Sequence, residues 1–419
     1  MPRSRWFIGV IALVTTAVSC DRVTGPGTGK APQPLTRLPR ALSAAEQRVV
    51  AGTNAFAFGL LRQTVRRDPS ANVFISPLSA ALALGLAMNG ARGETLAQMR
   101  ATLGFGDIPL ADADASYGAL VDLLLGLDPG VDVRVANSVW ARQGFPFEAS
   151  FLDVARNDFD AQTSVLDFDD PNAAPKINEW VESSTGGKID RIVEAPIDRD
   201  VVMYLINAVY FRGSWRERFD PAQTRDAPFH AGGGRTSTVK LMHHSGEGSY
   251  FEAGRVRGVE LAYGRGAYVM DVVLPPDGMQ LTDFVASLDT ATWQRWVGSL
   301  HAVHLDLALP RFRLSYETQM KPALVDLGMA LAFTPFRADF TGISPLGDRL
   351  YISHVKQKTY ANVDEEGTEA AAATSVEISF TSATPSVSFV VDRPFVVAIR
   401  ERFSGTLLFL GAIQAPEDP

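Results

Sequence analysis

A serine and a lysine three residues apart have types and a spacing that could do chemistry. Ser353 and Lys356 form an S-x-x-K, in which a lysine activates a serine nucleophile, and Tyr360 opens a Y-x-N soon after. That chemistry needs the serine at the start of a helix, with the lysine one turn away, and a K-T-G much later in the chain. Tyr351 and Ile352 are instead typical of a strand, and the chain contains no K-T-G. The sequence therefore argues against this hydrolytic site.

Four histidines could suggest a metal site: His243, His244, His301 and His304. Adjacent residues of a strand point to opposite faces, so His243 and His244 cannot share an ion without distortion. No cysteine or acidic cluster accompanies them, and no G-x-S-x-G nucleophile motif occurs in the chain. We therefore expect no metal, no cofactor and no catalytic residues, and the protein is predicted not to be an enzyme.

The segment EEGTEAAAATSVEISFTS, residues 365–382, supports two predictions of secondary structure. Thr368 and Glu369 before four alanines are typical of a capped helix start. The alternation of side chains is instead typical of a strand with one buried face. One face would carry Thr368, Ala370, Ala372, Thr374, Val376, Ile378 and Phe380; the other would carry Glu369, Ala371, Ala373, Ser375, Glu377, Ser379 and Thr381. The segment thus combines small side chains with the pattern of a strand inside a sheet.

The bulk composition is that of a soluble globular protein with a large core. The chain has 419 residues, of which 46% are hydrophobic and 21% charged, and its length alone suggests two or three domains. The net charge is −8 and no run of Lys and Arg occurs, which argues against binding to nucleic acid. The only cysteine is Cys20, so no intramolecular disulfide can form.

The N-terminus is typical of an export signal. Arg3 and Arg5 precede an apolar stretch at residues 6–14 that is too short to span a bilayer. The following AVSC resembles a bacterial lipobox, in which Cys20 would become the lipidated first residue, although Ala17 stands where such motifs usually carry Leu. The alternative is ordinary cleavage after Ser19. We expect a signal peptide at 1–19 and an exported protein, extracellular or periplasmic, anchored to the membrane as a lipoprotein.

Residues 20–42 are rich in Gly and Pro and contain few large apolar residues. Such a segment buries little surface, so we expect an unstructured tether. No second linker follows, and residues 43–419 are expected to fold together.

Helices are predicted in the first half of the chain and strands mainly in the second. Ser43 and Glu46 resemble a capping box that opens a helix to Arg66, and Ser76 can cap a helix at residues 77–88. A further amphipathic helix is predicted at 175–184. Strands are predicted at 72–75, 131–140, 201–211, 239–242, 259–263, 268–274, 303–309, 387–389, 396–400 and 406–413. This order argues for a mixed α+β fold with a large, mainly antiparallel sheet.

Several distinctive motifs follow one another along the chain: NVFISPLS at 72–79, NAVYFRGSW at 207–215 with FD after it, LPRF at 309–312, ADFTGI at 338–343, and DRPF at 392–395 followed by GTLLFLG at 405–411. Together they resemble the serpin family of serine protease inhibitors. The motifs run in family order from about residue 43 to the end of the chain. The resemblance implies a serpin fold: a single large α+β domain with three β-sheets, eight to nine helices and an exposed reactive loop.

The resemblance also implies a mechanism and a partner. A target serine protease would attack the loop and become trapped in a covalent complex, and the inhibitor would act as a monomer. The hinge of the loop would comprise Glu365, Gly367, Thr368, Glu369, Ala370, Ala371, Ala372, Ala373 and Thr374. Counting along the family pattern places the reactive bond at Thr381–Ser382, with Phe380 as the alternative residue before the cut.

The family pattern further implies a polar cluster beneath the opening of the sheet, matched here by Ser76, Ser79 and Asn207, with Trp215 where insertion begins. Gln357 stands where the family often has a histidine. An amide can donate and accept similarly, but it does not titrate near neutral pH. We therefore expect opening of the sheet to be less sensitive to pH than in relatives.

A non-inhibitory serpin, acting as a binding or chaperone-like module, is the alternative function. Non-inhibitory members often carry bulky or charged residues, or proline, on the inward face of the hinge. This hinge carries none of them, which favours inhibition.

Overall fold

The computed structural model describes residues 33–368 and 386–418. The chain divides into two units, residues 1–33 and 34–419, and the second contains every element described below. Cys20, hinge residues 369–374, Phe380, Thr381 and Ser382 lie outside the described residues. Within the described ranges, no helix is both long and apolar enough to cross a membrane.

The long first helix, α1 (Ala44–Arg67), begins where the sequence predicts. The Ser43 side chain accepts a hydrogen bond from the Glu46 backbone N–H (3.1 Å), and the Glu46 carboxylate accepts one from the Ser43 N–H (2.6 Å), which completes a capping box. Helix α2 (Pro77–Asn89) begins after Ser76. The other α-helices of the described part are α3 (Gly93–Thr102), α4 (Leu110–Leu125), α5 (Ala149–Asn157), α6 (Ala173–Ser184), α7 (Leu281–Ser287), α8 (Thr290–Gly298) and α9 (Lys321–Asp326).

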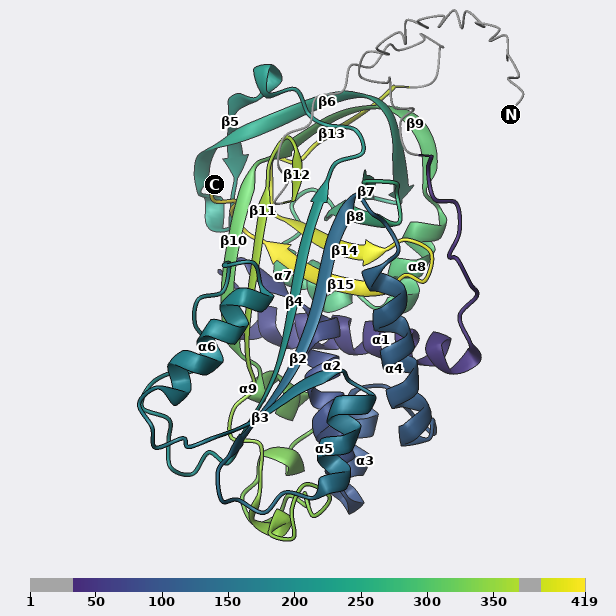
Figure 1. Cartoon of the computed structure of the whole chain (residues 1–419). Helices are drawn as coiled ribbons and strands as arrows, with labels where there is room; N and C mark the ends of the chain where they lie inside the picture. Colours follow the sequence, from purple (N-terminus) through teal and green to yellow (C-terminus); the bar gives the residue numbers. More distant parts are fainter. Residues whose placement is uncertain (1–32, 369–385, 419) are drawn as a thin grey trace, which may run out of the picture. The chain divides into compact units, whose positions relative to one another are not determined.

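A six-stranded sheet carries the region of interest. Its order is β10 (Phe312–Gln319), β11 (Lys356–Val363), β12 (Gly367–Thr368), β4 (Met203–Ser214), β2 (Val131–Arg142) and β3 (Ala161–Leu166). Only the β2–β3 pair is parallel among these strands. Figure 1 shows β12 as a very short strand between one end of β11 and one end of β4. Helix α6 packs on β2 and β4 through a separate apolar cluster that includes Ile177, Val181 and Ile206.

The remaining described strands form a second sheet of nine. It runs β1 (Val73–Ile75), β15 (Leu407–Ile413), β14 (Phe395–Glu401), β8 (Tyr268–Leu274), β7 (Val256–Tyr263), β6 (Thr236–Ala253), β9 (His301–Pro310) and β13 (Ser386–Val390), with β5 (Arg225–His230) also paired to β6. The described strands therefore form two hydrogen-bonded sheets where three were expected. The reason is β6, whose first part pairs with β5 and whose last part pairs with β7, so that it joins two ladders into one sheet.

The main core is built around β8, β14 and β15, in which every residue is buried. This core includes a buried network of ion pairs. Arg400, 2% exposed, donates from Nε to Asp271 (2.6 Å) and from Nη2 to Glu260, and Arg402 also contacts Glu260 (3.0 Å). A buried guanidinium is tolerated because both facing carboxylates pair with it.

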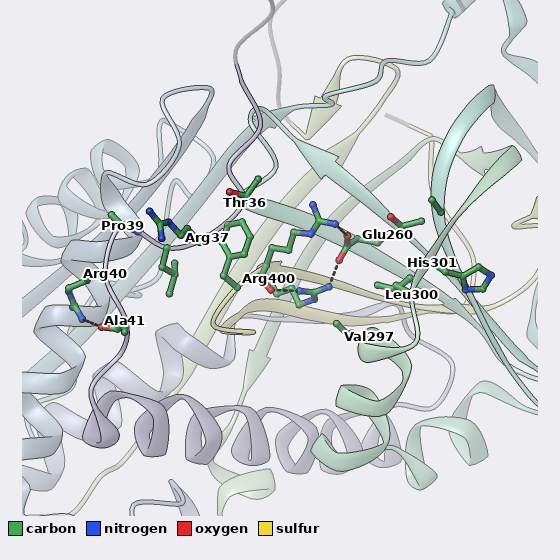
Figure 2. A pocket seen from close by; sticks show the side chains of 15 residues that line it. Thr36, Arg37, Pro39, Arg40, Ala41, Glu260, Val297, Leu300, His301 and Arg400 are labelled. Carbon is green, nitrogen blue, oxygen red and sulfur yellow. Dashed lines mark hydrogen bonds and ion pairs between the residues drawn. The ribbon is translucent and has the colours of Figure 1, made fainter. Parts of the chain in front are cut away.

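Residues 34–42 were expected to belong to the tether, but they lie against the folded unit. The Leu35 N–H donates to the carbonyl of Arg265 (2.8 Å), and Arg40 pairs with Glu46 (2.6 Å). Leu35, Leu38 and Leu42 pack on the core, and these leucines supply an apolar contact that the composition of the whole segment does not indicate. The segment also lines an open pocket of about 1030 Å³. Figure 2 shows Arg400 and Glu260 among the side chains that line it.

Asp114 on α4 gives the fold a predicted dependence on pH. The residue is 2% exposed. Burial raises the pKa of Asp114 to about 7, although a hydrogen bond from Asn89 opposes the rise, and nearby Asp158 adds to it. The folded-state pKa lies above the unfolded value, so this carboxyl favours folding most below about pH 4 and its contribution is lost as the pH rises through about 7.

Replacing Asp114 by Asn should therefore stabilise the protein in alkali more than in acid. The expected gain in the free energy of unfolding is about 4 kcal/mol at pH 8 and less than half of that at pH 5. Thermal unfolding midpoints of wild type and Asp114→Asn at the two pH values measure it. Asp112→Asn, an exposed position on the same helix, is the matched control. A gain that is equal at both pH values would show that Asp114 is not the titrating group.

Candidate functional site: the hinge and the slot of the six-stranded sheet

Strand β12 joins two strands that are otherwise separate. Gly367 lies opposite Ser214 and Thr368 opposite Gly213 on β4, while Thr368 also pairs with Val363 on β11. A Cβ at Gly367 would lie only 2.1 Å from the Gly213 carbonyl oxygen, and φ at Gly367 is +153°. Glycine is therefore required by the close approach of β4, in addition to any freedom it gives the hinge.

Thr368 faces the interior, as the alternation of the segment predicts. It is 1% exposed, and its hydroxyl lies 2.6 Å from the hydroxyl of Tyr263. The Tyr263 ring stacks on Trp215, with centroids 4.4 Å apart. Burial raises the pKa of Tyr263, so the phenol stays neutral and this hydrogen bond persists over the whole physiological pH range. The Thr368 side chain thus fills its site with a small polar group, and its hydroxyl is paired with a neutral phenol.

Glu365, at the start of the hinge, is fixed by an ion pair. Its carboxylate accepts from Arg311 Nε (2.8 Å) and lies 2.5 Å from Arg311 Nη2, and the Thr224 hydroxyl also donates to it. Burial alone would raise the pKa of Glu365, but the bonds from Arg311 and Thr224 hold it below its usual value. The side chain is 6% exposed and charged, so moving it away from Arg311 would leave a partly buried guanidinium without its carboxylate.

Hydrogen bonds to the backbone carbonyls of residues 364–366 also hold this turn in place. The Trp215 indole N–H donates to the Asp364 carbonyl (2.8 Å) and the Trp215 backbone N–H to the Glu366 carbonyl (2.8 Å). The Phe219 N–H donates to the Glu365 carbonyl (3.1 Å). Three successive carbonyls of the hinge therefore accept from the segment 215–219, which we call the anchor segment.

Beyond β12, a slot lies between β4 and β11. On β4, residues 203–212 pair with β2 along one edge, and on β11, residues 356–362 pair with β10 along one edge. No described strand pairs with the other edge of either stretch. The two edges face a common gap because β12, only two residues long, separates β4 from β11 at its end. Each edge presents backbone N–H and C=O groups suited to a further strand.

A polar cluster lies farther along the slot from β12, beside Asn207 of β4 and Gln357 near the start of β11, and it includes the residues that the sequence singles out. Gln357 accepts from the Ser76 N–H (3.0 Å) and donates to the Ser76 carbonyl (2.8 Å). The Ser76 hydroxyl donates to the Leu408 carbonyl (2.8 Å), and the Ser79 hydroxyl donates to the Asn207 carbonyl (3.3 Å). The Gln357 amide thus both accepts from and donates to the Ser76 backbone, and it brings no titrating group to the cluster.

Asn207 contributes an unsatisfied acceptor to this cluster. Its Nδ2 donates to Asn137 Oδ1 (2.7 Å), and Asn137 in turn donates to the Phe159 carbonyl. The Asn207 Oδ1 is buried and has no hydrogen-bond partner in the described part of the chain. Sequence reasoning did not single out Asn137, although an asparagine within the predicted strand 131–140 was an available signal.

The other candidate chemistry finds no support in the described residues. Ser353 lies in an irregular segment, neither in the strand that its neighbours suggested nor at a helix start, and strand β11 begins only at Lys356. Lys356 pairs with Glu194 (3.5 Å) and Glu317 (3.3 Å) rather than with a serine. Across residues 33–368 and 386–418, no group of three or more His, Cys, Asp and Glu residues could hold a metal ion.

Known proteins with similar sequences share nearly the whole described unit. An uncharacterised serpin-like protein of the archaeon Thermococcus kodakarensis is 34% identical over 89% of this chain and 87% of its own length. The leukocyte elastase inhibitor of Equus caballus is 33% identical over 88% of this chain and all of its own length.

Solved structures give the same result for the fold. The native state of tengpin, a thermophilic serpin, superimposes with a TM-score of 0.80 at 30% identity, over 92% of this chain and 97% of tengpin. Human thyroxine-binding globulin in complex with thyroxine gives 0.81 at 26% identity, over 90% of this chain and all of that one. The family model described as serpin, serine protease inhibitor, matches residues 51–416. Because the family model matches most of the chain and relatives at this identity are covered over most of their length, this chain belongs to the serpin family.

Proposed function

We propose that the protein is a suicide-substrate inhibitor of a serine endopeptidase. The observation that carries the proposal is the slot between β4 and β11, which opens at the point where the hinge enters the sheet. A chain whose hinge already pairs with both walls of an open slot has a route by which the following residues can add as a new strand.

The chemical step is that of ordinary acyl transfer. The serine Oγ of the protease attacks the carbonyl carbon of Thr381, and its proton passes through the protease histidine to the amide nitrogen of Ser382, which leaves. Thr381 is then held as an ester on the protease. The cut frees the hinge side of the loop to enter the slot before water hydrolyses the ester, and strand insertion of this kind is characteristic of serpin reactive loops in general.

The pairing already present in β12 fixes the register of the proposed insertion. Continued six residues beyond Thr368, the same register would place Thr374 opposite Asn207 on β4 and opposite Gln357 on β11. The inserted strand would therefore bring a threonine hydroxyl beside the unsatisfied Asn207 Oδ1. Its even-numbered residues would follow Thr368 onto the buried face, where only small side chains precede Val376.

Inhibition is favoured over a non-inhibitory role by the tight environment of the hinge. Gly367 is in contact with the β4 backbone, and Thr368 fills its site with a small side chain. A bulky or charged hinge, as in a protein adapted only to bind, would not fit. Among the relatives, leukocyte elastase inhibitors are named for inhibition, whereas thyroxine-binding globulin is named for a ligand.

Incubation with a panel of serine proteases tests the proposal. The full chain should form an adduct with at least one protease that survives boiling in detergent and runs at the summed mass of the two proteins on a denaturing gel. Protease inactivated at its serine should give no adduct. Cleavage of the loop without any adduct, by every protease that cuts it, would favour the non-inhibitory alternative.

The residue before the scissile bond should set the choice of protease. Thr381 suits a small or shallow primary pocket, such as that of an elastase-like or subtilisin-like enzyme, whereas Phe380 would suit a chymotrypsin-like enzyme if the cut lies one residue earlier. Thr381→Arg should redirect inhibition to trypsin-like proteases, because their pocket pairs a carboxylate with the guanidinium. Association rate constants for trypsin and an elastase measure the switch, and unchanged target choice would move the scissile bond elsewhere.

We further propose that the protein is exported by the signal at residues 1–19 and anchored through a lipid on Cys20. The lone cysteine after small residues supports this, since a lipid on Cys20 would attach the domain to the membrane surface. Cys20→Ser should release the protein from the membrane fraction into the soluble fraction. Equal partitioning of wild type and variant would favour ordinary cleavage after Ser19.

A further inference from the structure

His244, on β6, contacts the anchor segment and has no role in the proposed trapping. Its ring projects from β6 toward the anchor segment, where its Nε2 lies 3.4 Å from Glu217 Oε2. That nitrogen is buried and makes no hydrogen bond within the described part of the chain. The ring also meets Phe219 at 70°, with centroids 5.9 Å apart. Two residues of the anchor segment, Glu217 and Phe219, therefore contact one histidine.

The site leaves room for this histidine. A Cβ at Gly246 would lie 2.9 Å from His244 Nε2 and 3.8 Å from Glu217 Oε2. Glycine at that position keeps the space beside the imidazole open, so the ring can approach the carboxylate. The His244 side chain is 21% exposed, which screens a charge only in part.

Glu217 is the titratable group in contact with the ring. On the far side of the anchor segment, Glu365 is already paired with Arg311. On β6 itself, Lys240 is paired with Asp226, and Arg218, next to Glu217 in the chain, is engaged in an interaction of its own. His243, the neighbour of His244, points to the opposite face of the strand. A charge on His244 would therefore interact most strongly with Glu217.

We propose that protonation of His244 tightens the anchor segment and so holds the hinge more firmly in acid than at neutral pH. An imidazolium has an N–H at both ring nitrogens, which converts the unpartnered Nε2 into a charged donor toward Glu217. A cation beside the Phe219 ring is also attracted to its face. The Phe219 N–H and both Trp215 N–H groups hold the hinge carbonyls, so a tighter anchor segment restrains Glu365, Glu366 and the strand that follows.

The inference places pH sensitivity where β12 enters the sheet, whereas the polar cluster farther along the slot carries the amide of Gln357. Its consequence for inhibition rests on the proposed function: mild acid should slow entry of the cleaved hinge, and neutral pH should release it. The structural claim itself concerns the uncleaved protein and is tested there.

Hydrogen exchange of the full chain, followed by mass spectrometry between pH 5.5 and 8 and corrected for intrinsic exchange, measures the hold on the hinge. Peptides covering 215–219 and 364–368 should exchange about threefold more slowly at pH 5.5 than at pH 8, the size expected of a partly exposed ion pair. His244→Gln and Glu217→Gln should both abolish this difference. His243→Gln, on the adjacent residue of the same strand, should retain it.

A wild type without the difference, or a difference that survives in His244→Gln, overturns the proposal. Loss of the difference in His243→Gln as well would also overturn it, because a general change in β6 would then explain the result. The exchange measurement uses no protease. Failure to form a covalent adduct would therefore contradict the proposed function alone. The role of His244 would still be decided by the exchange measurement.

Discussion

Replacing Thr368 by Arg should turn the protein from an inhibitor into a substrate that proteases cut and release. Thr368 is 1% exposed and its hydroxyl meets the neutral phenol of Tyr263, so an arginine there would replace a small polar group by a buried charge beside an uncharged partner. An unpaired buried charge costs several kcal/mol, which should slow entry of the cleaved strand by more than about tenfold. Hydrolysis of the ester would then be faster than insertion of the strand, and the protease would be released. The number of inhibitor molecules consumed per protease inactivated measures this partition.

The matched controls separate charge from loss of the hydroxyl and from damage to the fold. Thr368→Ser keeps the hydroxyl and Thr368→Val keeps the shape, so both should still trap protease with nearly one molecule consumed per protease. Circular dichroism of uncleaved Thr368→Arg should match that of wild type, because β12 contributes only two residues to the sheet. If Thr368→Arg traps protease as efficiently as wild type, insertion along the register of β12 is wrong.

Much of this architecture could be predicted because its causes are local. The capping box at Ser43 and Glu46 starts α1 by bonds between residues three apart, and the short, mostly apolar run at residues 268–274 matches the fully buried strand β8. The inward direction of Thr368 also follows from alternation alone, since the side-chain period of a strand is two. The family motifs then supplied the order of the elements, which local patterns do not specify.

The partners of the hinge could not be predicted, because each comes from a distant part of the chain. Arg311 is 54 residues from Glu365, Tyr263 is 105 from Thr368, and Thr224 is 141 from Glu365. Alternation shows which face a residue occupies but not what it meets there. The LPRF motif placed Arg311 in the sequence without indicating its carboxylate.

Two boundaries were missed for a related reason. Strand β6 continues to Ala253, well past the predicted end at residue 242, through Ser245, Gly246, Glu247 and Gly248. Those residues lack an apolar period, and pairing with β9 sustains the strand instead. Residues 34–42 were assigned to the tether by composition averaged over the whole segment, although three leucines near its end fix it to the core.

Cutting the reactive loop should make the protein much more resistant to heat. Nicking at Thr381–Ser382 frees the hinge to fill the slot, where residues 203–212 of β4 and 356–362 of β11 have unpaired edges among the described strands. Filling both edges would add about fifteen backbone hydrogen bonds, a gain on the order of 10 kcal/mol at roughly 0.5–1.5 kcal/mol each, before the entropy of ordering the loop is subtracted. The thermal unfolding midpoint should therefore rise by about 10 degrees.

Differential scanning calorimetry of intact and nicked protein measures this rise, with mass spectrometry to locate the cut. Nicked Thr368→Arg is the informative comparison, because it is cut at the same bond but must bury a charge to insert. Its midpoint should rise much less than that of nicked wild type. The two results together distinguish a strand that enters the slot from a loop that merely relaxes when cut, since relaxation would be the same in both proteins. Equal midpoints for intact and nicked wild type would mean that the native state stores no energy for trapping, and the proposed inhibitory mechanism would then lack its driving force.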